Sequence, residues 1–63
     1  MNRLIIVNDE NKHGIKVNEW LNRYSGYLCD KTIKFLKQFN EDTVIEASIY
    51  DLNCWVMENI TVL

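Results

Sequence analysis

Short apolar and polar blocks follow one another along this chain, and each block predicts an element of secondary structure. The segment from Arg3 to Asn8 holds four consecutive apolar residues, Leu4 to Val7, and predicts a strand that is apolar on both faces. Such a strand needs cover on both sides, either in the centre of a sheet or at an edge sealed by another chain. The polar residues 11–14, which end in Gly14, predict a turn.

The stretch from Ile15 to Tyr24 fits two structures. Its first residues have a two-residue period, which is typical of a strand that folds back onto the first one. A helical period has more members, so we expect a short helix over 17–24, with Asn18 as the N-cap and Gly26 as a left-handed stop. The residues with helical spacing are Val17, Trp20, Leu21, Tyr24 and Leu28.

Residues 30–39 predict the best-defined helix of the chain. Asp30 is a suitable N-cap, apolar residues recur near the helical period from Ile33 to Phe39, and Asn40 is a suitable end. Three lysines follow one flank of this helix as a basic ridge, and the segment contains no acid after Asp30. The lysine ridge consists of Lys31, Lys34 and Lys37.

The last third of the chain also fits two structures. Between Thr43 and Tyr50, apolar and polar residues alternate as in a half-buried strand. An apolar helical period from Ile45 to Val56 and a capping-box pattern, Thr43-x-x-Glu46, favour a helix instead. The high content of β-branched and aromatic residues favours strands, so we expect a hairpin over about residues 43–62 with its turn at 51–53.

Together these elements predict one small α+β domain over residues 1–63, a three-stranded sheet with the helix of residues 30–39 packed on one face. If the Ile15 segment is a strand, the sheet has four strands in the order ββαββ. A chain of this length buries only roughly 60% of the surface that it exposes when unfolded, which is near the lower limit for folding alone. Stabilisation by a partner is therefore relevant from the start.

The charged residues are divided unevenly along the chain. Their balance is zero over residues 1–30, +3 over 31–40 and −5 over 41–63, where there is no base. We expect the last segment to present an acidic face to a partner protein, although such charges commonly form no more than a solvated surface. The residues of this predicted acidic face are Glu41, Asp42, Glu46, Asp51 and Glu58.

Seven aromatic residues are more than a core of this size readily buries. Phe35, Phe39 and one tryptophan are expected in the core. The other aromatic residues would serve as anchors at a protein interface, where Trp and Tyr concentrate binding energy. The candidates are Trp20, Tyr27, Tyr50 and Trp55.

Little in the sequence supports catalysis, a metal or another cofactor. His13, Cys29 and Cys54 lack the close ligand pairs of a structural zinc site, and a catalytic pocket of about 300 Å³ is large for so small a core. Two cysteines 25 positions apart are typical of free thiols in the cytoplasm. The apolar run near the N-terminus is too short for a signal peptide or a membrane span.

The sequence thus predicts a cytoplasmic protein-binding module, an inhibitor or adaptor that occupies a surface of a partner protein, with a homo-oligomer through a strand edge as a further expectation. Eight asparagines beside many isoleucines and lysines indicate an AT-rich coding sequence and favour a phage or bacterial source. The alternative is a nucleic-acid-binding regulator that contacts phosphates through the lysine ridge. A net charge of −2 and only two arginines disfavour this alternative.

Overall fold

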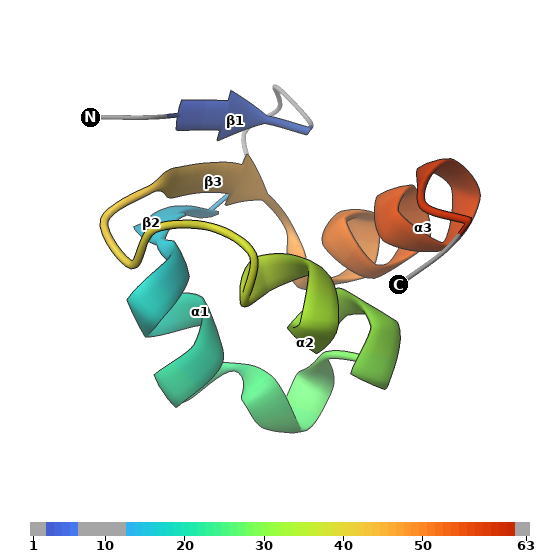
Figure 1. Ribbon diagram of the computed structural model, residues 1–63, viewed down its shortest axis with the longest axis horizontal. Helices are drawn as coiled ribbons and strands as arrows, with labels where there is room; N and C mark the ends of the chain where they lie inside the picture. Colours follow the sequence, from blue (N-terminus) through green and yellow to red (C-terminus); the bar gives the residue numbers. More distant parts are fainter. Residues whose placement is uncertain (1–2, 7–12, 62–63) are drawn as a thin grey trace.

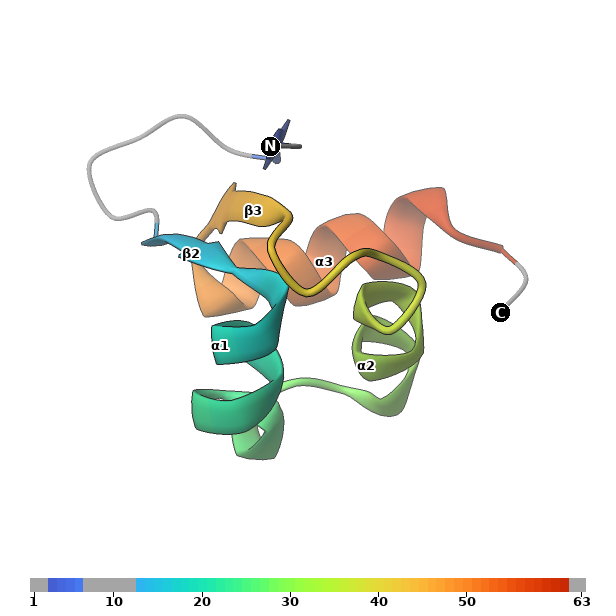
Figure 2. The same cartoon turned by 60° about the vertical axis from the view of Figure 1, so that its left-hand side comes forward.

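The computed structural model describes residues 3–6 and 13–61 (Figures 1 and 2). Three strands, three α-helices and one short 3₁₀ helix follow one another along these residues. In chain order they are β1 (Arg3–Ile5), β2 (His13–Lys16), α1 (Val17–Arg23), η1 (Ser25–Tyr27), α2 (Asp30–Leu36), β3 (Val44–Ala47) and α3 (Ile49–Asn59). The α+β class and the three-stranded sheet predicted from the sequence are therefore confirmed.

The sheet has β3 in its centre, between β1 and β2. β1 pairs with β3 in parallel, with Leu4 opposite Ile45, while β2 pairs with it in antiparallel fashion, with Ile15 opposite the same residue. All four residues of β3 are buried, as expected of a central strand. The apolar N-terminal strand of the sequence prediction is thus an edge strand, and its predicted residues 7–8, like residues 11–12 of the predicted turn, lie outside the described residues.

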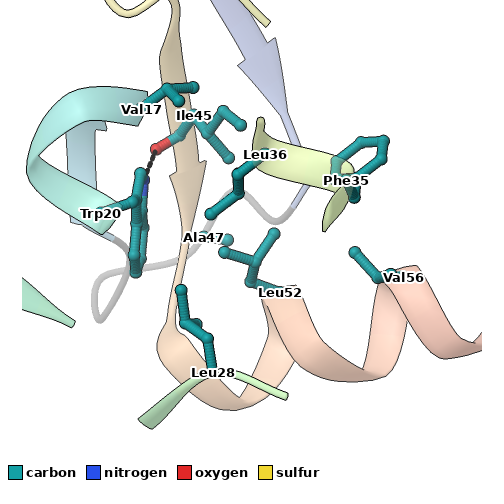
Figure 3. Close-up of a cluster of buried hydrophobic side chains, with 9 residues drawn as sticks. All are labelled: Val17, Trp20, Leu28, Phe35, Leu36, Ile45, Ala47, Leu52 and Val56. Carbon is teal, nitrogen blue, oxygen red and sulfur yellow. Dashed lines mark hydrogen bonds between the residues drawn. The ribbon is translucent and has the colours of Figure 1, made fainter. Parts of the chain in front are cut away.

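All three α-helices pack on the same face of the sheet, the one to which Ile45 and Ala47 point (Figures 1 and 2). The sequence led us to expect one main helix there, but the buried cluster draws on all three (Figure 3). A three-helix layer is needed because a three-stranded sheet alone buries too little apolar surface. The buried members of the cluster are Val17, Trp20, Leu28, Phe35, Leu36, Ile45, Ala47, Leu52 and Val56.

The hairpin predicted over residues 43–62 is wrong. Its first half is the strand β3, but Ile49–Asn59 is a helix, and the predicted turn at 51–53 lies within it. Ser48 caps this helix: its hydroxyl oxygen accepts the Asp51 amide at 3.1 Å and its hydroxyl donates to the Asp51 carboxylate at 2.7 Å. The cap and the burial of the Leu52 and Val56 side chains outweigh the β propensity of this segment.

The predicted helix over 17–24 is confirmed as α1, but neither of its predicted ends is correct. The helix begins directly after β2, and its first amides are satisfied by the loop before β3: Val17 N–H donates to the Thr43 carbonyl at 2.8 Å and Asn18 N–H to the Glu41 carbonyl at 3.1 Å. Asn18 is therefore not the N-cap. Gly26 does not take a positive φ, because the chain continues into η1 rather than turning sharply.

The helix predicted over 30–39 is present as α2 but is shorter. Cys29, not Asp30, is its N-cap, and its last helical residue is Leu36. The chain then turns more tightly, with the Phe39 amide donating to the Leu36 carbonyl at 3.1 Å. Asn40 takes part in the following turn, where its side chain accepts the Asp42 amide at 2.9 Å.

Trp20 joins α1 to the sheet. Its side chain has no exposed surface, and its indole Nε1–H donates to the Ile45 carbonyl oxygen at 3.2 Å (Figure 3). Its ring lies against those of Tyr24, at 5.4 Å between centroids, and His13, at 6.1 Å. Trp20 is therefore a core residue that fixes the angle of α1, because a buried indole needs both packing and a hydrogen-bond acceptor.

Replacing Trp20 by Phe should lower the free energy of unfolding by about 2–4 kcal/mol, since it removes buried volume and leaves the Ile45 carbonyl without this donor. Urea denaturation followed by circular dichroism measures the loss. The matched control is Trp55→Phe at a half-buried position, for which we expect less than about 1 kcal/mol. Equal losses in the two variants would contradict the role assigned to Trp20.

Candidate functional site

A groove of about 610 Å³ lies between α3 and the segment that joins α1 to α2. One wall is residues 26–29, which include the end of η1 and the N-cap of α2. The other wall is the outer side of α3. The lining residues are Gly26, Tyr27, Leu28, Cys29, Tyr50, Asn53, Cys54, Met57 and Glu58.

The outer side of α3 carries a second apolar stripe. Tyr50, Cys54 and Met57 are spaced at i, i+4 and i+7 and so share one side of the helix, away from the core residues Leu52 and Val56. The Tyr50 and Met57 side chains are 75% and 60% exposed. The helix is therefore apolar on two sides, and the described residues bury only one of them.

Asn53 holds the two walls of the groove together. Its Oδ1 accepts two hydrogen bonds, from the Cys29 amide at 3.1 Å and from the Thr32 hydroxyl at 2.8 Å. Its Nδ2 donates to the Tyr27 carbonyl at 3.1 Å. One side chain of α3 thus binds the end of η1 and the start of α2, which places Tyr27 across the groove from α3.

Both cysteines line the groove, and both are free, half-buried thiols. The Cys29 Sγ lies 3.0 Å from the Thr32 Oγ1, and hydrogen bonding to this hydroxyl lowers the pKa of the Cys29 thiol. On α3, a hydrogen bond to Cys54 is the main cause that raises the pKa of the Tyr50 phenol, and the negative charges of Asp51 and Glu58 contribute.

A second hollow, of about 340 Å³, lies on the other side of Tyr50 and Cys54. It shares Tyr50, Cys54 and Glu58 with the groove, so the two depressions lie next to each other along α3. The lining residues of the second hollow are Ile6, Tyr50, Asp51, Cys54, Trp55 and Glu58. In the part of the chain that the structure describes, the walls of the two hollows contain two acids and no base.

The structure does not gather the five predicted acidic residues on one face. Asp51 and Glu58 lie at the hollows of α3, whereas Glu41 and Asp42 are exposed in the loop before β3, where Asp42 pairs with Lys16 at 3.5 Å. Glu46 is buried in β3, and its carboxylate pairs with Arg3 at 3.1 Å. The acidic face was predicted on a hairpin, and it is divided because that segment is a strand followed by a helix.

The four predicted aromatic anchors are also divided. Tyr27 and Tyr50 are 70% and 75% exposed and stand on opposite walls of the groove. Trp20 is in the core, as described above, and so is not available to a partner. Trp55 is half-buried, with its ring 5.5 Å from that of Phe35, and lines the second hollow.

The lysine ridge lies on and directly after α2, away from the groove lining. Lys34 and Lys37 are exposed, and Lys31 is half-buried. Contact of these residues with nucleic acid stays a prediction.

The sequence also pointed to no metal site and no membrane span. Over residues 3–6 and 13–61, no three side chains of His, Cys, Asp or Glu come close enough together to hold a metal ion. No described helix has the length and apolar character to cross a membrane. Comparisons with protein-family models, characterised proteins and solved structures returned no match. The argument for function therefore depends on the groove.

Replacing Asn53 by Ala should lower the free energy of unfolding by about 2–4 kcal/mol, because two part-buried polar groups and one exposed carbonyl lose their partner. The Cys29 amide should also exchange its hydrogen faster. Denaturant titration and amide exchange by NMR give the two readouts.

The control is Asn59→Ala, at an exposed position on the same helix whose side chain donates only to the Trp55 carbonyl at 2.9 Å. It should change the free energy of unfolding by no more than about 0.5 kcal/mol and leave the exchange of Cys29 unchanged. Unaltered exchange of Cys29 in the Asn53→Ala variant would show that Asn53 does not hold the groove wall.

Proposed function

We propose that this chain is a protein-binding module that holds a segment of a partner protein in the groove between residues 26–29 and α3. It acts in the cytoplasm, as an inhibitor or adaptor that occupies a surface of its partner.

One observation carries the proposal. Among the described residues four large hydrophobic side chains are exposed, and three of them, Tyr27, Tyr50 and Met57, line this one groove. Exposed apolar residues scattered singly need no explanation, but a group around a depression is typical of an interaction site. Tyr supplies much contact area at low entropic cost, and Met adapts to irregular apolar partners.

The construction of the groove supports binding rather than catalysis. Its apolar residues stand on a helix and on a loop held by Asn53, so little ordering is needed when a partner binds. The available nucleophiles are Cys29 and Cys54, and the histidine of the chain, His13, lies in β2 beside Tyr24, outside the groove. No histidine among the described residues therefore accompanies the thiols in the groove, where the one carboxylate is that of Glu58.

Photo-crosslinking tests this function. A benzophenone amino acid is placed at Tyr50 or, in a separate variant, at Tyr27, and the chain is produced in the cells that encode it. We expect both variants to give one adduct of the same discrete mass after illumination, since both positions face the same occupant.

The control position is Gln38, which is exposed just after α2 and does not line the groove. It should give no such adduct. Adducts of equal intensity at Gln38, or none at either tyrosine, would contradict a partner in the groove. An adduct with twice the mass of the chain would instead indicate a second copy at the groove rather than the homo-oligomer predicted through a strand edge, and crosslinks to nucleic acid at Gln38 would support the regulator.

A further inference from the structure

We propose that the occupant of the groove is a basic amphipathic helix, which places apolar side chains between the two walls and Lys or Arg side chains against Asp51 and Glu58. This inference rests on the proposed function and adds the chemistry of the partner.

The first argument is the charge of the surface. Among the described residues, the lining of the groove and of the second hollow includes Asp51 and Glu58 and no Lys, Arg or His. The two acids are seven residues apart on α3 and so lie on the same side of it, two turns apart. Together they form a negative edge beside the stripe of Tyr50, Cys54 and Met57.

The second observation is that the described residues place no cation against this negative edge, although the Ser48 hydroxyl donates to the Asp51 carboxylate in the cap of α3. Elsewhere in the described residues three of the five other acids have ion-pair partners: Glu46 pairs with Arg3, Asp42 with Lys16, and Glu19 with Arg23. No ion pair reaches Asp51 or Glu58 within the part of the chain that the structure describes, and α3 contains no base. Their effect extends to Tyr50, whose pKa both carboxylates help to raise. An occupant with cations would stabilise this edge.

The third argument concerns the size and shape of the groove. About 610 Å³ is within the range of about 300–1,000 Å³ that holds a small ligand, so it admits a few side chains and not a folded domain. An apolar stripe two turns long on a rigid helix is complementary to the i, i+3, i+4 and i+7 side chains of a second helix. The occupant is therefore a short helical segment.

A second copy of this chain fits the surface less well. In a symmetric pair formed through the stripe of α3, each copy would bring its own Asp51 and Glu58 to the same interface. The interface would then bury four acids and, from α3, no base. Like charges at an interface oppose association, so a basic partner is favoured over a symmetric dimer.

Model peptides test the inference. The probes are two fluorescent 14-residue peptides with leucine at i, i+3, i+4 and i+7. The remaining positions are all lysine in one peptide and all glutamate in the other. Fluorescence anisotropy measures their dissociation constants with the full chain. We expect the leucine–lysine peptide to bind at least tenfold more tightly than the leucine–glutamate peptide.

Matched variants locate the charge effect. Asp51→Asn with Glu58→Gln should weaken binding of the leucine–lysine peptide at least tenfold. The control, Glu41→Gln with Asp42→Asn, changes the net charge equally but away from both hollows and should leave the dissociation constant within about twofold. Because Asp51 also takes part in the cap of α3, Glu58→Lys alone decides the question if the double variant does not fold.

The outcomes separate this inference from the proposed function. Equal affinity for the two peptides, or equal weakening in the two double variants, overturns the basic partner. Equally tight binding of both peptides that is lost in Tyr50→Ser overturns the charge argument while supporting a groove that binds apolar segments. If Tyr50→Ser leaves the binding of the leucine–lysine peptide unchanged, the groove is not the binding site and both proposals are contradicted.

Discussion

The arrangement of the candidate site depends on the three hydrogen bonds of the Asn53 side chain. Residues 25–28 form only one turn of 3₁₀ helix, whose backbone hydrogen bonds stay within residues 24–28, so these bonds do not attach the segment to α2 or α3. Asn53 supplies that attachment from the middle of α3, and buried Leu28 adds apolar contact beside it. Because an amide that loses such partners is costly, the loop and the helix keep a fixed separation, and the groove between them is preformed.

The two-sided character of α3 links the stability of the fold to its proposed function. Leu52 and Val56 complete the core under the sheet (Figure 3). Tyr50 and Met57 remain exposed on the same helix. The core thus holds the helix rigid, and the rigid helix presents the exposed side chains in a defined geometry. In a chain of 63 residues the core is small, and apolar side chains that stay exposed add nothing to the stability that burial provides. A binding role therefore accounts for these exposed side chains better than stability does.

Much of the fold follows from local sequence patterns, but the site follows from contacts between distant residues. The helical periods of residues 17–24 and 30–39 predicted α1 and α2, and the exposed Tyr27 and Tyr50 were among the expected anchors. The hairpin prediction failed because β propensity was given more weight than the cap at Ser48 and the apolar period of α3. Since the segment was predicted as strands, the helical spacing of Tyr50, Cys54 and Met57 at i, i+4 and i+7 was not recognised. The role of Asn53 had no local signal, since its partners lie 21 to 26 residues away.

The central claim is that the groove, and no other surface, receives the partner. Chemical-shift mapping by NMR tests it most directly, with the leucine–lysine peptide added to isotopically labelled chain. The account predicts that the largest shifts fall on the amides of residues 26–29 and 50–58 and on the Met57 methyl group, while β1 and the lysine ridge change little. Shifts concentrated on the sheet or on Lys34 and Lys37, with the Met57 methyl unmoved, would contradict it.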